Sequence, residues 1–532
     1  MTHKWQLVLG IFPVLLFFPL AAKKDSHPSL SLVTMVPLLE LEKKLIDNLD
    51  DYVKALDHKL QLLRSHILDI RAENEKAELD PIQYLSNPLN SFSLIRRLHQ
   101  DWVGWRKFME QSVGIVQMRK MNSWQRELPT KEDLSEACDG IIRIQITYNL
   151  RVDDIIRGKL KGRQYNVSMS PSDIFAVGNH LRHTSIFLAA FLWLREIRPP
   201  SQENSVSQPD HIISTEKKVI KVLTDMHVKE GYFSMALRFI NYWLQLFPYN
   251  AYPERARRAL KKLMKTKSET PYGRPLDLAR DLDTKQLRWS CSKILKSRPS
   301  SHLQCSYNSS TTPFLRLAPL KMEQIGLDPY VVLYHDVLSP GEISQLQKME
   351  FGPLKTAVVG GTDNRMRRLR SGKTFSISCE FNRLTKRIKR RIEDISGLDL
   401  SGSENLQVLN YGIGGHFDMH TDFRNISSSS GVRQPPDRIA TVLFYLSDVE
   451  QGGETVFPHA GYSVKPRAGT ALFWYNLHTD GIGDLSTIHA ACPVILGSKW
   501  IMTQWISEEP QWFKRPCLRP SPSQLSKQRK RN

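Results

Sequence analysis

Residues 411–423 read YGIGGHFDMHTDF and contain two overlapping His-x-Asp triplets, His416/Asp418 and His420/Asp422. On a β-strand, residues i and i+2 project from the same face, so either triplet would present an imidazole and a carboxylate to one point. With a second histidine from another strand, this gives the two-histidine, one-carboxylate set that holds Fe(II) and leaves positions open. Chance alone produces most such triplets, and periodicity does not separate the two pairs, so the surrounding residues must decide.

The residues around this stretch are typical of an all-β domain. Beyond Leu317, short β-rich runs occur at 439–446, 470–476 and 499–506, separated by Gly-Gly, Pro-rich and Asp-Gly turns. This spacing favours a sandwich or barrel. The segment 386–395, KRIKRRIEDI, is predicted to be a helix within the same domain.

The amino-terminal half has helical periodicity instead. From Leu38 to Ile70, apolar residues recur every three or four positions, which predicts a long amphipathic helix. Such helices either pair between chains or fold back as a hairpin, so dimerisation is a hypothesis. Between 170 and 249, two helix pairs have tetratricopeptide spacing, with Gly231 in the second turn. Pairs of this kind stack into a peptide groove, although plain helix packing explains the spacing equally well.

Composition and the amino terminus narrow the functional class. The chain has 532 residues, of which 41% are hydrophobic, so several folded domains are expected. The formal charge of +20 favours acidic partners without choosing among them. Residues 1–22 have the layout of a secretory signal peptide, and this predicted export disfavours nucleic-acid binding. Glycosylation sequons, which agree with a secretory lumen, occur at Asn166, Asn308 and Asn425.

The region from about 330 to 517 closely resembles the catalytic domain of collagen-type prolyl 4-hydroxylase α subunits, a family of Fe(II)/2-oxoglutarate dioxygenases. The resemblance rests on 411–423, GGETVFP (452–458) and STIHAACPVILGSKW (486–500). The helical half is similar to the same subunits' dimerisation and peptide-binding regions in order and length. The resemblance therefore implies an all-α amino-terminal half followed by a double-stranded β-helix, or jelly-roll, catalytic domain with flanking helices.

These patterns divide the chain into six parts. We expect a signal peptide (1–22), a helical dimerisation region (30–140), a tetratricopeptide-like peptide-substrate-binding domain (141–266), a linker with a possible disulfide (267–325), the dioxygenase domain (326–510) and a basic tail (511–532).

The resemblance also assigns site residues. It implies that His420, Asp422 and His489 bind Fe(II), and the distance from YGIGG selects this His-x-Asp pair over the preceding one. It implies that Lys499 pairs with the distal carboxylate of 2-oxoglutarate and that Tyr411 lies near this cosubstrate. A single ammonium in an apolar pocket is a strong selector for a dianionic keto acid.

The implied reaction is hydroxylation of proline at C4 in collagen-like X-Pro-Gly peptides. It uses Fe(II), O2 and 2-oxoglutarate, releases succinate and CO2, and depends on ascorbate to rescue oxidised iron. The family works in the endoplasmic reticulum lumen as an α2β2 assembly with protein disulfide isomerase as the β subunit. The alternative is a catalytically weak or inactive peptide-binding or chaperone-like subunit. In its favour, Ser507 replaces a common family histidine, and the peptide groove has few tyrosines.

Six cysteines permit several pairings. The resemblance implies a Cys492–Cys517 bridge, which would tie the strand after His489 to the carboxy-terminal segment. We expect Cys291–Cys305 as a second bridge, within the linker. Two cysteines, Cys138 and Cys379, are then left as buried thiols.

Overall fold

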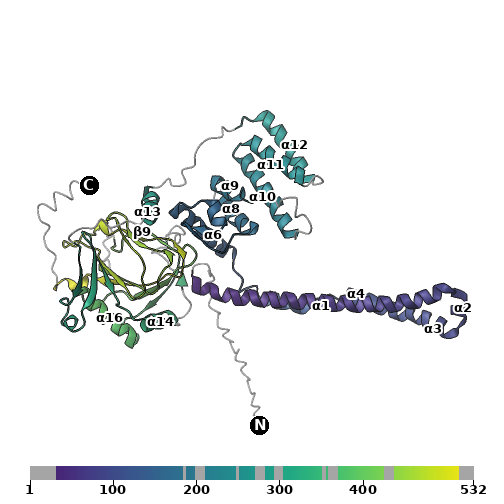
Figure 1. The fold of residues 1–532 in the computed structure, drawn as a ribbon, viewed down its shortest axis with the longest axis horizontal. Helices are drawn as coiled ribbons and strands as arrows, with labels where there is room; N and C mark the ends of the chain where they lie inside the picture. Colours follow the sequence, from purple (N-terminus) through teal and green to yellow (C-terminus); the bar gives the residue numbers. More distant parts are fainter. Residues whose placement is uncertain are drawn as a thin grey trace, which may run out of the picture.

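A computed structural model describes residues 31–183, 187–197, 210–246, 251–269, 282–292, 303–349, 355–356, 370–424 and 436–514. These residues form a long helical rod, a cluster of shorter helices and a β-domain (Figure 1). The predicted signal peptide, Asn425 and Cys517 lie outside the described residues.

The rod is a helical hairpin. Its first arm is α1 (Leu32–Leu79), 48 residues that extend for about 70 Å at 1.5 Å per residue. The chain returns through α2 (Pro81–Ser86), α3 (Pro88–Arg96), η2 (Arg97–Asp101), α4 (Trp102–Glu110) and α5 (Ile115–Trp124). The turn forms where Asp80 and Asn87 cap helices that begin with proline. The predicted long helix is confirmed, and it folds back within the chain.

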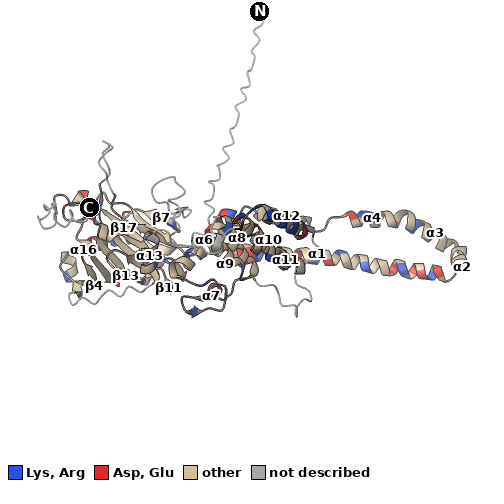
Figure 2. Cartoon of the chain, turned by 90° about the horizontal axis from the view of Figure 1, so that it is seen from above, with Lys and Arg blue, Asp and Glu red and all other residues tan. Residues whose placement is uncertain are grey.

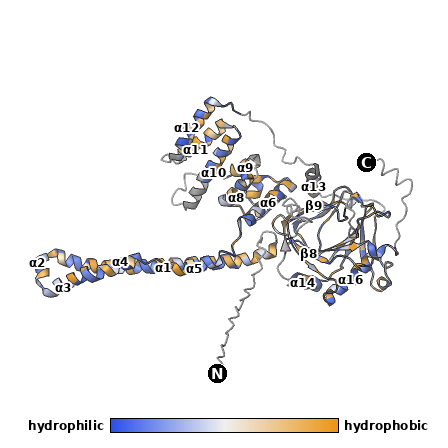
Figure 3. Cartoon of the chain, turned by 180° about the vertical axis from the view of Figure 1, so that it is seen from behind, coloured by the Kyte–Doolittle hydropathy of each residue, from blue (hydrophilic) through white to orange (hydrophobic). Residues whose placement is uncertain are grey.

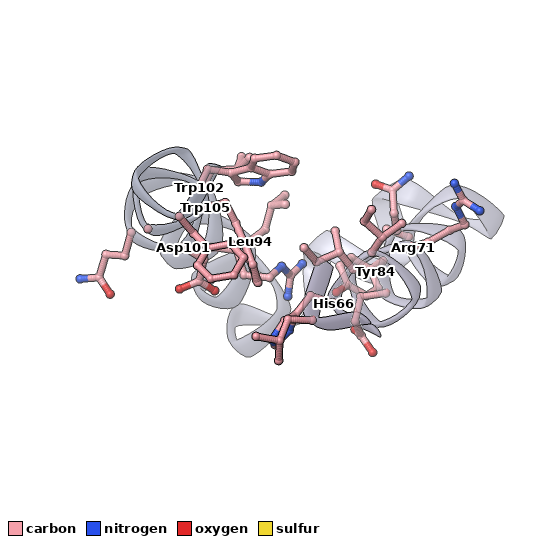
Figure 4. A pocket seen from close by; sticks show the side chains of 18 residues that line it. His66, Arg71, Tyr84, Leu94, Asp101, Trp102 and Trp105 are labelled. Atoms are coloured by element: carbon pink, nitrogen blue, oxygen red, sulfur yellow. The ribbon is translucent and has the colours of Figure 1, made fainter. Parts of the chain in front are cut away.

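The two arms touch along their length and enclose a cavity near the tip. The Asn48 amide donates to the Gln117 carbonyl at 3.0 Å, and the Lys59 ammonium donates to the Gln111 carbonyl at 2.6 Å. Nearer the tip the arms part around a cavity of about 1000 Å³. Figure 4 shows that its lining includes His66, Arg71, Tyr84, Leu94, Asp101, Trp102 and Trp105.

The helical cluster comprises α6 (Lys131–Tyr148), α7 (Val152–Ile156), α8 (Pro171–His183), α9 (Phe187–Leu194), α10 (Asp210–Lys229), α11 (Phe233–Leu246) and α12 (Ala251–Thr266), with a hairpin of β1 (Lys159–Leu160) and β2 (Arg163–Gln164). The two predicted helix pairs are α8/α9 and α10/α11. Gly231 lies in the second turn with φ of +81°, a conformation that favours glycine. A Cβ at Gly178 would lie 2.6 Å from the Leu194 side chain, so glycine allows the first pair to pack closely.

The β-domain consists of two main sheets packed face to face. The larger sheet has the strand order β3-β4-β5-β14-β10-β17-β8-β7-β6 in the described residues. Its strands are β3 (Cys305–Asn308), β4 (Leu320–Leu327), β5 (Tyr330–His335), β6 (Lys355–Thr356), β7 (Lys373–Ile377), β8 (Leu406–Asn410), β10 (Arg438–Tyr445), β14 (Ala471–Tyr475) and β17 (Trp500–Ser507). The smaller sheet has the order β13-β12-β15-β9, with β9 (Phe417–His420), β12 (Thr455–Phe457), β13 (Tyr462–Val464) and β15 (His489–Ala491). A ribbon of β11 (Gln451–Gly452) and β16 (Val494–Leu496) accompanies them.

The larger sheet has a hydrophobic core on each face. On the outer face, α14 (Pro340–Lys348) and α16 (Arg383–Ser396) bury residues such as Leu346 and Ile388 against the strands. On the inner face, Tyr445 and Trp474 pack against Phe457 of the smaller sheet. Figure 3 shows the hydrophobic residues of the domain distributed over its strands. The predicted all-α half, jelly-roll domain and helix at 386–395 are confirmed.

Two predictions about 267–325 are wrong. The β-domain begins earlier than predicted, because β3 and β4 hydrogen-bond to each other and join the larger sheet through β5. Within the predicted linker, residues 305–308 and 320–325 are thus part of the β-domain.

The disulfide pairing also differs from the prediction. Cys291 is bonded to Cys492, so neither Cys291–Cys305 nor Cys492–Cys517 forms. Cys291 lies on α13 (Leu282–Ser292), which packs with Tyr148 and Val456 in one hydrophobic cluster. This packing places the Cα atoms of Cys291 and Cys492 5.7 Å apart, within the normal range for a disulfide. Cys305 has a free thiol and is exposed on β3. Cys138 and Cys379 are also free thiols, of which Cys138 is buried and Cys379 is partly buried.

Candidate active site

His420, Asp422 and His489 converge at one end of the smaller sheet. Strand β9 pairs antiparallel with β15, and His420 lies directly opposite His489 in this register. The Nε2 atoms of the two histidines are each 3.7 Å from an oxygen of Asp422. One ligand atom from each residue lies within 4.8 Å of the others, so the three side chains could hold one metal ion.

The local structure differs from the simple strand prediction in one respect. His420 is the last residue of β9, and Asp422 lies in the bend that follows rather than on the strand. The carboxylate is held there by a buried network. Thr441 donates to Asp422 Oδ2 at 2.7 Å, and the Asn476 amide donates to Thr441 Oγ1 at 2.9 Å.

Backbone carbonyls orient both imidazoles. His420 Nδ1 is 2.8 Å from the Asp418 carbonyl, and His489 Nδ1 is 3.0 Å from the Thr487 carbonyl. A carbonyl can only accept, so each Nδ1 carries the proton and each Nε2 presents its lone pair to the centre. Burial, then the neighbouring His489, lower the pKa of His420 to about 3. The imidazole is therefore neutral at physiological pH, which is the form that binds metal.

The overlapping pair His416/Asp418 does not reach this centre. The buried His416 ring is 2.9 Å from the Ser371 hydroxyl, and the Asp418 carboxylate accepts from the Met419 N–H at 2.8 Å. Neither side chain lines the cavity at the centre. The structure thus brings together the predicted pair, His420/Asp422, and not the alternative.

Lys499 and Tyr411 line the same cavity as the three converging residues. Lys499 is only 1% exposed, and its ammonium donates to the Gly453 carbonyl at 2.6 Å and lies 5.1 Å from the centroid of the Tyr411 ring. Burial lowers the pKa of Lys499 to about 7, although the charge of Glu454 opposes this shift. The cavity measures about 30 Å³, roughly the volume of one water molecule.

The donor set of this centre fits Fe(II). Two imidazole nitrogens and one carboxylate oxygen form the two-histidine, one-carboxylate set of non-haem iron oxygenases. The three groups lie at one end of the smaller sheet, and Phe457 and Trp474 pack against the His489 ring with centroids 5.6 and 4.8 Å away. These aromatic walls leave the remaining side of the centre for a ligand.

The helical cluster supports the loops beside this centre. Arg143 of α6 donates to the Gly414 carbonyl at 2.9 Å, and the Tyr148 hydroxyl donates to the Pro493 carbonyl at 2.6 Å. A Cβ at Gly140 would lie 2.4 Å from the Ile413 carbonyl oxygen, so glycine allows α6 to touch the 411–416 loop. Ile413 and Gly414 precede His420 in the sequence, and Pro493 follows His489. The contacts with α6 therefore flank the segments that carry the two histidines.

Ser507 and the described glycosylation sequons lie away from the cavity of this centre. Ser507 is buried at the end of β17 and is not among the residues that line the cavity. Asn308 is 9% exposed, and its amide bonds to Thr311, so this sequon is a poor acceptor for a glycan. Asn166 is exposed and remains available.

The sequence motifs did not indicate several residues at this centre. Thr441 and Asn476 lie inside β-rich runs, where a polar residue has no distinguishing spacing. Arg370 lines the cavity with Lys499, yet in the sequence it ends the basic run RMRRLR (365–370), which has the appearance of a solvated segment. The sequence therefore predicted Lys499, and not Arg370, as a cation at this centre.

The jelly-roll fold and its histidine–aspartate centre define the class of 2-oxoglutarate- and Fe(II)-dependent oxygenases. The model of the 2OG-Fe(II) oxygenase superfamily matches residues 406–507. The model of the prolyl 4-hydroxylase alpha-subunit N-terminal region matches residues 31–162.

Whole-chain relatives identify the family within this class. Prolyl 4-hydroxylase subunit alpha-2 of Gallus gallus is 30% identical over 514 residues, which cover 92% of this chain and 95% of the relative. Prolyl 4-hydroxylase subunit alpha-1 of Homo sapiens is 29% identical over 532 residues, covering 95% and 99%. The chain belongs to the prolyl 4-hydroxylase α-subunit family.

One solved structure with similarity is the viral collagen prolyl hydroxylase of Paramecium Bursaria Chlorella virus-1 bound to 2OG. It is 23% identical, covers 33% of this chain and 94% of its own, and has a TM-score of 0.27. Among the described helices, none is long and apolar enough to cross a membrane.

Proposed function

We propose that this chain is the catalytic α subunit of a prolyl 4-hydroxylase that acts on proline C4 in collagen-like X-Pro-Gly peptides. The observation that carries the proposal is the convergence of His420, Asp422 and His489 in the same buried cavity as Lys499. One atom of O2 enters the new proline hydroxyl and the other enters succinate, and CO2 leaves from 2-oxoglutarate. The reaction balances without a further reductant.

His420, Asp422 and His489 would hold Fe(II). When bound, the iron supplies the activation of O2 and the oxidation of the C–H bond. The contribution of the protein is to keep His420 neutral, to fix the carboxylate through Thr441, and to exclude bulk water from the centre.

Lys499 would bind the distal carboxylate of 2-oxoglutarate. Its ammonium is held by a single carbonyl, that of Gly453, and a carboxylate is a stronger partner for it. The Tyr411 ring lies beside this ammonium and forms one wall of the cosubstrate position. A dianionic ligand also raises the proton affinity of Lys499, so cosubstrate binding and protonation of this lysine are coupled.

The helical half would supply the peptide and the assembly. The stacked pairs α8/α9 and α10/α11 are suited to an extended proline-rich peptide. The rod exposes large apolar side chains on α1, including Leu39, Leu49 and Leu68, each more than 60% exposed, and these suit an α–α dimer. Figure 2 shows basic and acidic residues interspersed along the rod.

The remaining features of the proposal follow from membership in the family. They are protein disulfide isomerase as the β subunit of an α2β2 assembly, location in the endoplasmic reticulum lumen, and ascorbate as a reductant for oxidised iron. The glycan proposed at Asn166 rests on its sequon and its exposure.

The competing proposal is a peptide-binding subunit with weak or no turnover. The altered residue at Ser507 favours it, but this residue does not line the cavity. To distinguish the two, the full-length chain is supplied with Fe(II), 2-oxoglutarate and a (Pro-Pro-Gly)-type peptide, and hydroxyproline and succinate are measured. Peptide-dependent formation of both supports the enzyme. Tight peptide binding with neither product supports the binding subunit.

A further inference from the structure

A hairpin of the helical half reaches the part of the β-domain that contacts Lys499. The hairpin is formed by β1 and β2, and its turn residues Lys161 and Gly162 have φ of 45° and 83°. Positive φ at both positions is typical of a tight two-residue hairpin turn. Leu160 and Met169 pack against the hydrophobic core of the helical cluster. The hairpin is therefore fixed to the helices of the two predicted pairs.

The side chain of Gln451 joins this hairpin to the β-domain. The Tyr165 hydroxyl donates to Gln451 Oε1 at 3.1 Å. The Gln451 amide nitrogen donates to the carbonyls of Leu160 at 3.2 Å and Lys161 at 3.4 Å. Both ends of the Gln451 amide are thus bound by the hairpin, and these bonds fix its orientation.

Gln451 begins the segment 451–454, QGGE, which contacts the proposed cosubstrate lysine. The Gly453 carbonyl accepts from the Lys499 ammonium at 2.6 Å. The charge of the next residue, Glu454, opposes the lowering of the Lys499 pKa. Two consecutive residues of this segment therefore act on the buried ammonium.

The backbone of this segment depends on its neighbours for a fixed conformation. Gly452 and Gly453 have φ of 77° and 76°, and glycine has more backbone freedom than any other residue. The β-domain limits this freedom through the pairing of β11 with β16 and through the Gly453 N–H, which donates to the Pro493 carbonyl at 3.2 Å. The helical half adds the bonds of Gln451 and the Tyr148 hydroxyl, which would lie 2.9 Å from a Cβ at Gly452.

We propose that Gln451 is a positioning residue for the cosubstrate. Its bonds to the hairpin fix the Gly453 carbonyl, which orients the Lys499 ammonium toward the distal carboxylate of 2-oxoglutarate. This proposal rests on the proposed function of Lys499. An ammonium has three donors, so it can keep its bond to Gly453 while it donates to a carboxylate. The affinity for 2-oxoglutarate then depends on contact with the helical half, which is the part proposed to bind the peptide.

The test removes the Gln451 amide and measures cosubstrate binding. Gln451→Met keeps the length of the side chain but removes its hydrogen bonds to the hairpin. The Kd of 2-oxoglutarate is measured anaerobically with the full-length chain and Fe(II), from the visible absorption of the chelated ferrous ion. We expect this Kd to rise about three- to tenfold, the range for the net contribution of one hydrogen bond. The kcat at saturating 2-oxoglutarate should stay within about twofold of wild type. An unchanged Kd overturns the proposal.

Two double mutants show whether the effect runs through the proposed contacts. In a Lys499→Met background, Gln451→Met should not raise the Kd of 2-oxoglutarate further, because both changes act on the same ammonium. Tyr165→Phe removes the hydroxyl that donates to Gln451, so it should raise the Kd alone but not in a Gln451→Met background. Additive effects in either pair would show that Gln451 acts by another route, and would overturn the proposal.

Glu450→Gln is the matched control. Glu450 precedes Gln451 and forms an ion pair with Arg163 of the same hairpin, but its side chain is 47% exposed. Exposed ion pairs contribute little to stability, so this variant should keep the wild-type Kd of 2-oxoglutarate. If Glu450→Gln and Gln451→Met raised this Kd equally, with equal losses in the free energy of unfolding, the role would be one of docking alone and the proposal would be overturned.

The outcomes also separate this proposal from the proposed function. An unchanged Kd in Gln451→Met, in a chain that hydroxylates the peptide, overturns the positioning role alone. A Kd that depends on both Gln451 and Lys499, in a chain that forms no hydroxyproline, supports the positioning role and counts against the catalytic function. A wild type that binds no 2-oxoglutarate overturns both.

Discussion

The imidazoles of His420 and His489 lie opposite each other in one antiparallel strand pair, with ring centroids 4.2 Å apart. The geometry of the centre thus depends on the register of β9 against β15. A slip of one residue would turn one of the two histidines to the other face of the sheet. The contacts that hold this register are therefore as important to the centre as the ligands themselves, and the predictions below address both.

The choice between the two His-x-Asp pairs is tested by His420→Ala and His416→Ala. We expect His420→Ala to abolish succinate release, because it removes one proposed ligand. His416→Ala should keep measurable activity, since His416 bonds to Ser371 and does not line the cavity. The opposite ranking in a succinate-release assay would overturn the assignment.

Thr441 is expected to position Asp422. Thr441→Val keeps the shape of the side chain but removes the 2.7 Å hydrogen bond to the carboxylate. Loss of such an outer contact typically weakens metal binding by about 10- to 100-fold. Equilibrium titration with Fe(II) under anaerobic conditions measures this effect, and Thr441→Ser, which keeps the hydroxyl, serves as the control. Equal affinities for all three proteins would remove Thr441 from the account.

Binding of 2-oxoglutarate should depend on pH through Lys499. The pKa of this group is lowered to about 7, so the empty site holds an ammonium below pH 7 and a neutral amine above it. The Kd of 2-oxoglutarate should be nearly constant below pH 7 and should rise by up to about tenfold per pH unit above it. In Lys499→Met, binding should be weak and free of this dependence. His420, with a pKa near 3, does not titrate in the same window.

The same lowered pKa affects stability in a defined direction. Between about pH 7 and the ordinary lysine value of 10.5, the unfolded chain binds the proton at Lys499 more tightly than the folded protein does. The contribution of this group to the free energy of unfolding therefore increases with pH across that window. Denaturant titrations of wild type and Lys499→Met at pH 7 and 9 test this, and the wild type should gain stability relative to the variant at the higher pH.

The Cys291–Cys492 bridge should stabilise the junction between α13 and the smaller sheet. It joins residues 201 positions apart, for which the chain-entropy model gives about 5 kcal/mol. Non-reducing peptide mapping should recover the two cysteines in one linked peptide pair. Cys291→Ser should lower the free energy of unfolding, whereas Cys305→Ser, at an exposed free thiol, should not. Recovery of a Cys291–Cys305 peptide would contradict the structure.

Contact between α6 and the 411–416 loop should matter for turnover. Gly140→Ala places a Cβ 2.4 Å from the Ile413 carbonyl oxygen, and this backbone atom can move only if the loop moves. We expect reduced stability and a lower kcat. Gly104→Ala is the matched control, since Gly104 is also helical and has nothing within 4 Å of the added Cβ. Equal behaviour of the two variants would show that α6 does not support the loop.

The sequence predicted the features that depend on local pattern. The periodicity of 38–70 indicated α1, and the β-rich runs indicated β10, β14 and β17. The assignment of His420, Asp422 and His489 needed the family resemblance, because periodicity left His416/Asp418 equally acceptable. The structure adds the strand register that brings the three together.

The features that were missed depend on tertiary packing. Strand β3 is short and mostly exposed, so its polar composition resembled a linker. The partner of Cys291 is set by the packing of α13 on α6 and the smaller sheet, which no local spacing records. Arg370 belongs to a basic run in the sequence, and only the fold shows that its side chain is buried at the centre.

Anaerobic titration of the full-length protein with Fe(II) and then 2-oxoglutarate tests the central claim most directly. A ferrous ion chelated by the keto acid has a visible charge-transfer absorption. We expect this band at one equivalent of iron in the wild type, its loss in Asp422→Asn, and a requirement for more 2-oxoglutarate in Lys499→Met. A wild-type protein that binds no Fe(II), or whose band is unchanged in Asp422→Asn, would contradict the account.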